Sequence, residues 1–448
     1  MRLFLMCTIG SLAAFHTIDA YQVYVSNNGS NDVSVIDTRT DAVVATIPVG
    51  VSPTFLVVSP NGQNVYVASF SDSAVNVINT ATNTVTATIP VGTNPNFLVI
   101  TPNGNAVYVP SATDGTVSVI DTATNTVTAT IMAGMTPNFP IVTPDGSTVY
   151  VPNVLAGTVT AISTATNTVA ATIPVGAFPV YLAGSPSGQY VYVPNSNGDT
   201  VSVIATATNT VIATIMTDVT PRFPVVSPNG NSVYISTATS GTLDVISTAN
   251  NTLIANPMVG SVPEFLSITP DGNMVYVSNT TSDNVSVIST TSNTVIATIP
   301  VGASPSFSVS TPDSQKVYVP SGSNTVSVIQ TATNTVISTV TVGDFPGYTA
   351  VSAAPNSTVS GRCRKDIFLA QTELFNEISW TAPTNVGLVA SYQIYRDAEL
   401  TDLIGTVPGT TLRIKDHNRE QNQSYTYYVV VVLQNGSIEV LGSITVIC

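Results

Sequence analysis

Few side chains in this sequence could carry out chemistry, and the most regular of them are single aspartates. Asp32, Asp72, Asp114, Asp199 and Asp283 each stand in a short segment rich in Asn, Ser, Thr and Gly. A calcium loop needs several oxygen ligands at fixed short spacing, as in D-x-D-x-D-G, whereas each of these segments offers one acid. The segments therefore indicate turns. Asp114 and Asp199 are candidate binding residues if loops from different parts of the chain meet.

Residues 21–355 contain no histidine and no cysteine, because His16 precedes this region and His417 follows it. Without imidazole or thiolate ligands, the region cannot hold haem through C-x-x-C-H, a zinc or copper site of the usual kind, or a Ser-His-Asp triad. The chemistry that remains is that of carboxylates, Tyr, Lys and Arg. We therefore expect no metal and no cofactor.

An aromatic residue recurs two positions after a proline, at Phe55, Phe97, Phe139, Tyr181, Phe223, Phe265, Phe307 and Tyr348. These side chains either fill space in a core or form a collar that stacks a sugar or a peptide side chain. Arg222 is the basic residue beside this series. It either orients a carboxylate of a partner or pairs with a nearby acid such as Asp218.

Charge is distributed unevenly along the 448 residues. Residues 21–355 hold three basic and fifteen acidic side chains, a net charge of −12. A surface so poor in Lys and Arg cannot neutralise phosphates, so binding to nucleic acids or to anionic membranes is not expected. A protein or a glycan remains the expected kind of partner.

The elements that must position these residues follow from a repeat. Eight tyrosines stand 42 residues apart in V-Y-V or V-Y-I triplets, at Tyr24, Tyr66, Tyr108, Tyr150, Tyr192, Tyr234, Tyr276 and Tyr318. Within one period, turn residues separate four runs rich in Val, Ile and Thr, which predict strands at residues 55–59, 64–68, 75–79 and 84–90. A repeat of about 40 residues with four short strands is typical of a β-propeller blade.

The repeats resemble the YVTN-type β-propeller family over residues 22–354. The matching pattern is V-Y-V, then V-S-V-I-D-T-x-T-N-T-V, then A-T-I-P-V-G-x-x-P, then S-P-D-G, as in VSVIDTATNTV at residues 117–127. By analogy with related propellers, the strand before the S-P-N-G turn is innermost and the A-T-I-P-V strand is outermost. The resemblance also implies a surface location, since some family members are surface-layer components.

That assignment predicts how the ring closes. The chain begins with a second-strand segment at residues 23–25 and ends its last repeat with an innermost segment at residues 347–352, so the two ends share one blade. Counting innermost strands gives eight blades. Seven repeats are typical of the family, and a seven-bladed ring with one displaced repeat is the alternative.

Residues 356–448 break the period and form a second predicted domain, a small β-sandwich. Its motifs, I-S-W-T-A-P at residues 378–383 and S-Y-Q-I-Y-R-D at residues 391–397, resemble a fibronectin type III module, with Tyr425 in the place of its tyrosine corner. Cys363 and Cys448 are expected to form a disulfide, with unpaired thiols as the alternative. This disulfide is foreign to the usual fibronectin pattern, which leaves another β-sandwich open.

Residues 1–20 are predicted to be a cleaved signal peptide, because Arg2 precedes an apolar run too short to span a bilayer and Ala20 offers a small residue for cleavage. We expect an exported protein that is periplasmic, secreted or at the cell surface. The expected function is that of a monomeric, non-enzymatic binding or adhesion scaffold. Two alternatives are a lactonase-like or hydrolase-like enzyme with carboxylates in the axial channel, and a structural subunit of a surface lattice.

Overall fold

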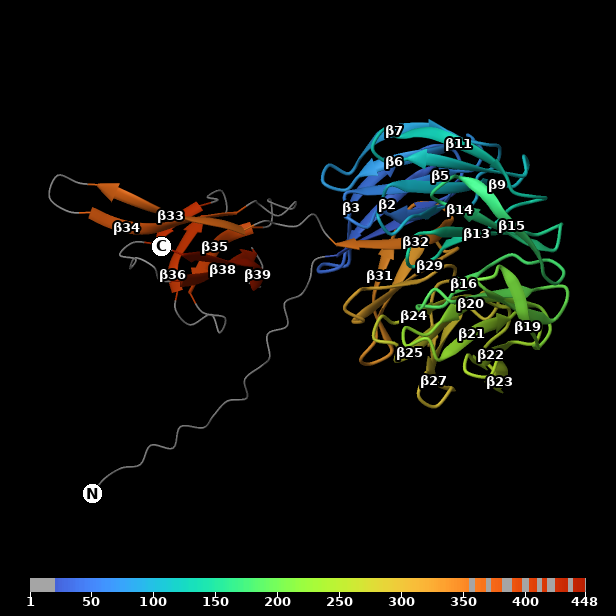
Figure 1. The fold of residues 1–448 in the computed structure, drawn as a ribbon. Helices are drawn as coiled ribbons and strands as arrows, with labels where there is room; N and C mark the ends of the chain where they lie inside the picture. The colour runs from blue at the N-terminus through green and yellow to red at the C-terminus, as the bar shows by residue number, and fades with distance from the viewer. Residues whose placement is uncertain are drawn as a thin grey trace, which may run out of the picture. The chain divides into compact units, whose positions relative to one another are not determined.

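The computed structural model describes residues 21–353, 359–367, 372–380, 389–396, 403–408, 413–416, 424–433 and 438–447. The predicted signal peptide therefore lies outside the described residues. By its contacts the chain divides into two compact units, one spanning Ala20–Ala354 and the other including Pro355–Cys448. Every regular element in the described ranges is a β-strand (Figure 1).

The first unit is a propeller of eight antiparallel sheets, each with four strands. Blade 1 is formed by β32 (Pro346–Ala353), β1 (Tyr21–Asn27), β2 (Asp32–Asp37) and β3 (Ala42–Pro48), from the innermost strand outwards. In blades 2 to 8 the strands follow chain order from the innermost to the outermost. Their bounds are β4 (Pro53–Val58), β5 (Asn64–Ser69), β6 (Ala74–Asn79) and β7 (Thr84–Pro90) in blade 2; β8 (Val99–Ile100), β9 (Ala106–Ser111), β10 (Thr116–Asp121) and β11 (Thr126–Met132) in blade 3; β12 (Ile141–Val142), β13 (Thr148–Asn153), β14 (Thr158–Ser163) and β15 (Thr168–Pro174) in blade 4; β16 (Ala183–Gly184), β17 (Tyr190–Asn195), β18 (Thr200–Ala205) and β19 (Thr210–Met216) in blade 5; β20 (Pro221–Val226), β21 (Ser232–Thr237), β22 (Thr242–Ser247) and β23 (Thr252–Ala255) in blade 6; β24 (Pro263–Ile268), β25 (Met274–Asn279), β26 (Asn284–Ser289) and β27 (Thr294–Pro300) in blade 7; β28 (Val309–Ser310), β29 (Lys316–Ser321), β30 (Thr325–Gln330) and β31 (Thr335–Thr341) in blade 8.

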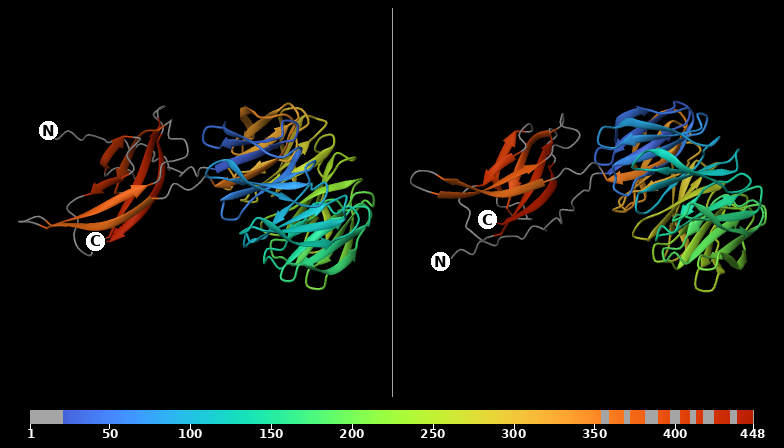
Figure 2. Two further views of the ribbon diagram at one scale, coloured as in Figure 1. Left: turned by 90° about the horizontal axis from the view of Figure 1, so that it is seen from above. Right: turned by 45° about the horizontal axis from the view of Figure 1, so that its top comes forward.

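The ring closes where the two ends of this unit meet. β32 pairs antiparallel with β1, with Val351 opposite Val23 and Thr349 opposite Val25. In Figures 1 and 2 the orange strand that ends the ring lies beside the blue strands that begin it. The predicted eight blades and the shared closing blade are confirmed, and the seven-bladed alternative is wrong.

The core of the propeller lies between blades. Val33 and Val35 of blade 1, for example, belong to the same buried apolar cluster as Val65 and Val67 of blade 2. Alternating Val and Ile residues present one apolar set to each neighbouring blade, because successive side chains of a strand point to opposite faces. The eight repeated tyrosines are fully buried in these interfaces.

Each innermost strand is irregular near its start. In blade 6, Pro221 is opposite Thr237 and Pro224 is opposite Ile235, so that Arg222 and Phe223 lie in a β-bulge. Blade 2 has the same shift between Pro53 and Leu56. A bulge changes the direction of a side chain relative to the sheet. Here the bulge includes the repeated aromatic residue in blades 2 and 6 and directly precedes it in blade 7.

In the second unit, two antiparallel sheets are described. β33 (Val359–Ile367), β34 (Thr372–Trp380) and β37 (Arg413–Asp416) form one sheet in that order; β36 (Leu403–Pro408), β35 (Val389–Tyr395), β38 (Ser424–Leu433) and β39 (Ile438–Ile447) form the other. This arrangement agrees with the predicted all-β class. Cys448 and the side chain of Cys363 lie outside the described residues, so the disulfide stays a prediction.

Candidate functional site

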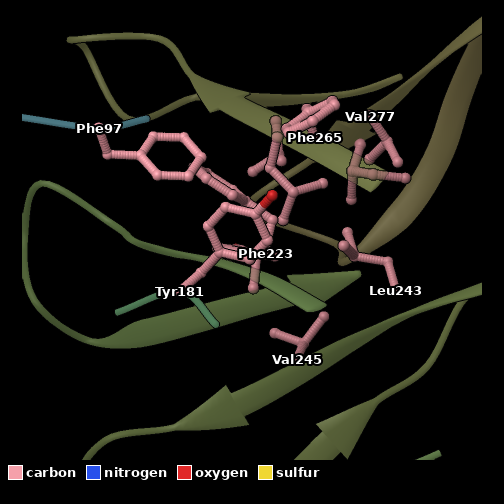
Figure 3. Packing of buried hydrophobic residues seen from close by; sticks show 11 residues of the cluster. Phe97, Tyr181, Phe223, Leu243, Val245, Phe265 and Val277 are labelled. Atoms are coloured by element: carbon pink, nitrogen blue, oxygen red, sulfur yellow. The ribbon is translucent and has the colours of Figure 1, made fainter. Parts of the chain in front are cut away.

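The repeated aromatic side chains come together in the propeller, although they belong to eight different strands or strand starts. Phe97, Tyr181, Phe223 and Phe265 are buried in one cluster, and the other four rings pack against it. Figure 3 shows the labelled rings of this cluster gathered together, with Leu243, Val245 and Val277 of blades 6 and 7 beyond them. The sequence series therefore corresponds to one aromatic cluster, which we call the axial plug.

The rings of the axial plug form two layers. Rings of adjacent blades have centroids 5.0–6.0 Å apart, and rings two blades apart are almost as close, at 5.3–6.4 Å. In a flat ring of eight, members two places apart would be nearly twice as far from each other as neighbours. The observed spacing requires two stacked squares fed by alternate blades, as alternate strands feed layers in closed barrels.

One layer consists of Phe55, Phe139, Phe223 and Phe307, and the other contains both tyrosines, Tyr181 and Tyr348, with Phe97 and Phe265. Most ring pairs meet edge to face, for example Phe55 and Phe307 at 87°. This geometry is favourable for aromatic pairs. The plug thus fills the axis at this level with ring contacts, which favours the packing interpretation, and its role in binding stays a prediction.

A charged pair lies beside the plug. Arg222 Nη1 donates to Glu264 Oε1 of blade 7 at 3.1 Å, and both side chains are partly exposed. Arg222 therefore pairs with an acid, as one of the two interpretations predicts, but the acid is Glu264 and not Asp218. Asp218 accepts instead from the hydroxyl of Thr242. Arg222 and Glu264 occupy the same repeat position in adjacent blades, 42 residues apart, so ring geometry rather than chain proximity selects the partner.

Glu264 also influences the two tyrosines of the plug. Burial raises the pKa of Tyr181, and the neighbouring Tyr348 and Glu264 raise it further while Arg222 opposes them. Burial and the Glu264 charge likewise raise the pKa of Tyr348. Both hydroxyls therefore remain protonated at neutral pH and can act as hydrogen-bond donors beside a carboxylate.

The predicted acidic loop residues fix backbone turns and are not brought together. Asp114 Oδ2 accepts the amide of Thr93 at 2.6 Å, and Asp199 Oδ1 accepts the amide of Thr220 at 2.9 Å. Asp72 and Asp283 accept equivalent amides of other blades. Each carboxylate ties a loop between second and third strands to a connection between blades, which agrees with a turn-forming role.

These loops and connections form one face of the propeller, because antiparallel strands place both at the same end of every blade. We call it the connection face: the inter-blade connections, such as residues 49–52, and the loops between second and third strands, such as residues 70–73. Backbone hydrogen bonds join the two kinds of segment, as between Ser71 N and Val51 O at 3.2 Å.

The connection face carries exposed apolar side chains that the sequence analysis missed. They are Val51, Met135, Leu155, Phe178, Val219, Val262 and Phe345. Met135 and Leu155 are 62% exposed and Phe345 is 66% exposed. A hydrogen bond from Val154 N to Thr136 O at 3.1 Å holds their two segments side by side. Departure from the small or polar residues of the other blades at the positions of Leu155, Phe178, Val262 and Phe345 was the available signal.

Three of these residues have left-handed backbone conformations. The φ angles are 64° at Phe178, 54° at Val262 and 53° at Phe345. Such angles are uncommon outside Gly, Asn and Asp, and a β-branched Val there is an outlier that costs about 1–2 kcal/mol. The same repeat position is left-handed in the other blades as well, for example at Ser52 and Asn94, so the fold sets the conformation and only the bulky apolar side chain is particular to these three blades.

A second missed feature lies in blade 6. Asp244 is fully buried and accepts the amide of Asp218 on Oδ2 at 2.8 Å. Burial, together with the nearby Asp218 charge, raises the pKa of Asp244 to about 6, although the amide of Asp218 opposes the rise. The signal in the sequence was the replacement of a repeated Gly and a repeated Ser by two acids.

The described residues offer neither a metal-binding group nor a membrane-spanning helix, and a hollow on the opposite face is open and polar. No group of three or more His, Cys, Asp or Glu side chains there could hold a metal ion. No described helix is long and apolar enough to cross a membrane. The face opposite the connection face has an open hollow of about 260 Å³ between blades 4 and 5, lined by polar residues such as Thr143, Asp145 and Thr206.

Comparisons with known proteins agree with this architecture. A family model for YNCE-like β-propellers matches residues 98–190. The chain is a β-propeller protein. No curated protein matches its sequence.

Solved structures resemble the propeller at low sequence identity. A chain of the hydrazine synthase of Kuenenia stuttgartiensis is 21% identical with a TM-score of 0.53, over 62% of this chain and 96% of that one. Dihydro-heme d1 dehydrogenase NirN is 15% identical with a TM-score of 0.64, over 77% and 78%. A functionally unknown protein of Desulfotomaculum acetoxidans is 18% identical with a TM-score of 0.52, over 62% and 94%. At this identity the likeness shows the fold alone.

Proposed function

We propose that this protein is an exported, non-enzymatic binding scaffold that presents the connection face of its propeller to a partner protein. The observation that carries the proposal is the set of exposed apolar side chains on that face. Phe178, Val262 and Phe345 stand there at left-handed φ angles, a conformation that Gly or Asn would adopt at lower cost. Exposed apolar groups of this kind mark protein interaction sites.

The axial plug supports surface binding over binding inside the ring. Its eight rings contact one another within and between layers, so the axis offers no open channel at that level. Partner side chains could meet the plug at its polar edge, where Arg222 and Glu264 lie beside Tyr181 and Tyr348. We propose that this edge contributes specificity for a polar group, and that the apolar residues contribute most of the affinity.

The second unit is proposed to be a fibronectin type III-like module that spaces or anchors the propeller. Its separation into a three-stranded and a four-stranded antiparallel sheet supports this proposal. Location at the cell surface, in the periplasm or in the medium is proposed from the apolar N-terminal run and from the resemblance to surface-layer propellers. Fold resemblance alone carries no function.

Substitution on the connection face tests the proposal. The doubly substituted Phe178→Ser, Phe345→Ser protein should lose capture of partner proteins from cell-surface extracts, with the affinity for the identified partner reduced at least tenfold. The matched control is Ile212→Ser, Ile337→Ser, which removes two exposed apolar side chains from the outermost strands β19 and β31. Equal capture by both variants would exclude the connection face as the binding surface.

Substitution of Glu264 tests the alternative that the protein is a hydrolytic enzyme. Glu264 is the acid that lies with Arg222 beside the plug, so Glu264→Gln should abolish any hydrolytic activity found for the wild-type protein. In the binding-scaffold proposal the same substitution leaves the capture of partners largely intact and alters only specificity. Activity of the wild type that Glu264→Gln abolishes would favour the enzyme.

A further inference from the structure

Blade 6 departs from the other blades at four neighbouring positions. Asp218 occupies a position at which the other seven blades have Gly. Thr237 occupies a position at which they have Asn or Ser, and Asp244 one at which five of them have Ser. Thr217 stands where the others have Val or Ala. With Thr242 these residues place two carboxylates and three hydroxyls together, a set that we call the blade-6 oxygen cluster.

The cluster is held by short contacts within blade 6 and its incoming connection. Thr242 Oγ1 donates to Asp218 Oδ2 at 2.8 Å, and Asp244 Oδ2 accepts the amide of Asp218 at 2.8 Å. Thr237 Oγ1 donates to the carbonyl oxygen of Thr242 at 2.8 Å. Thr242 and Asp244 are two positions apart on β22, so their side chains share one face.

The regular blades show what normally satisfies these oxygens. In blade 4, Asn153 Nδ2 donates to Thr158 Oγ1 at 3.0 Å and to Thr160 Oγ1 at 2.9 Å. Thr158 and Thr160 are the counterparts of Thr242 and Asp244. The asparagines of blades 1, 5 and 7 make the same pair of hydrogen bonds. An amide donor thus lies between the two third-strand side chains.

Blade 6 replaces that donor with acceptors. Thr237 has no amide, and among the described residues Asp244 Oδ1 has no hydrogen-bond partner although the Asp244 side chain is fully buried. Thr217 Oγ1 is a second buried oxygen without a described partner. The backbone of this position contacts the counterpart of Asp244 in blade 4, where Thr160 Oγ1 donates to the carbonyl oxygen of Ala133 at 2.7 Å.

Two of the substituted positions contact each other in the regular blades. A Cβ atom at Gly134, Gly176 or Gly260 would lie 2.5–2.6 Å from the amide carbon of the following asparagine, so the regular pattern requires glycine there. Blade 6 has changed both residues of this contact, to Asp218 and Thr237. Together with Asp244, the Asp218 carboxylate brings a second negative charge close to the position at which blades 1, 4, 5 and 7 have an asparagine amide donor.

We propose that the blade-6 oxygen cluster binds a calcium ion. Its donors are all hard oxygens, and two carboxylates balance the charge of a divalent cation. A cation beside Asp244 Oδ1 would take over the role of the asparagine amide and remove the cost of burying an unpaired carboxylate. Asp218 is half-buried, which leaves access from the connection face. Bound calcium would then link the connection from blade 5 to β21 and β22 of blade 6.

Thermal unfolding of the full chain in 10 mM CaCl2 and in EDTA tests the site. The wild-type melting temperature should be about 2–4 °C higher in calcium, as expected for a site of about millimolar affinity. Equilibrium dialysis against calcium should give one site that saturates in this range. The variant Asp218→Gly, Thr237→Asn, Asp244→Ser restores the residues of blade 7 and should lose both the shift and the site.

Two further variants make the result specific. Asp244→Asn keeps the shape of the side chain and should abolish the calcium shift. Asp114→Asn removes a carboxylate of the same face that accepts only the amide of Thr93, and should keep the full shift. The proposal is overturned if the wild type melts at the same temperature in calcium and in EDTA, or if the blade-7 variant keeps the calcium shift.

Discussion

At the residue scale, the repeated tyrosine does more than fill the interface between blades. Its hydroxyl reaches the turn of the next blade, 59 residues further along, as from Tyr150 to Asn209 Oδ1 at 2.6 Å and from Tyr108 to Asn167 Oδ1 at 2.6 Å. Tyr66 is an exception, because its buried hydroxyl and Asn125 Oδ1 have no described partner. One repeat position therefore contains both hydrogen-bonded and unbonded hydroxyls.

This contrast predicts opposite results for the same substitution. Tyr150→Phe should lower the free energy of unfolding by about 1–2 kcal/mol, because it leaves Asn209 Oδ1 without its donor. Tyr66→Phe is the matched control and should be neutral or slightly stabilising, since it removes a buried hydroxyl that has no partner. Urea denaturation measures both. Equal losses would show that the tyrosine hydroxyls act independently of their asparagine partners.

At the scale of the strand, eight equivalent aromatic positions near the starts of the innermost strands form a plug of two layers. Repeat spacing predicts that eight aromatic residues stand at equivalent places. It does not predict two layers, because identical positions in eight blades imply equal heights along the axis. Two layers form because eight large rings at one height along the axis would overlap, whereas four rings in each of two layers can all reach the axis.

A double-mutant cycle separates the two arrangements. Phe55 and Phe139 belong to blades two places apart, and their ring centroids are 5.3 Å apart. Phe55→Leu and Phe139→Leu should therefore be coupled by about 0.5–1.5 kcal/mol in the free energy of unfolding. The control pair is Phe55 and Phe223, which lie at opposite corners of one layer and have no described ring contact. A flat ring would give no coupling for either pair.

Features that repeat locally along the chain could be predicted from the sequence, whereas contacts between blades could not. Strand positions, turns and blade number could be predicted, because valine alternation, Asn-Gly turns and the tyrosine period are local signals that repeat. Asp218 is only four residues from Arg222 in the chain, whereas the partner of Arg222 is Glu264 in the next blade. The Asp218–Asp244 contact joins residues 26 apart and is visible in sequence only as two departures from the repeat.

At the scale of the whole molecule, the ring depends on one joint that is made from both ends of the propeller. β32 pairs with β1 over its full length, so blade 1 lacks its innermost strand until the last repeat has been added. The joint between blades 8 and 1 is also charged. Lys316 Nζ contacts Asp41 Oδ2 at 2.8 Å, and Tyr318 donates to Asp41 where most other tyrosines face an asparagine.

Two truncated chains test whether closure by β32 holds the propeller together. A chain of residues 1–354 keeps β32 and should unfold cooperatively as a monomer. A chain of residues 1–345 exposes the edge of β1, so it should melt at least about 10 °C lower and associate through that edge. Thermal circular dichroism and size-exclusion chromatography with light scattering measure both effects.

The charged contact supplies the control, because it stabilises the same joint without forming the sheet. Lys316→Met in the 1–354 chain should remove the ion pair with Asp41 and lower the melting temperature by only a few degrees, since a partly exposed pair contributes about 1 kcal/mol or less. A 1–345 chain that stays monomeric and melts with the 1–354 chain would mean that seven complete blades hold the ring without closure. If Lys316→Met is as damaging as the loss of β32, the ion pair rather than the strand closes the ring.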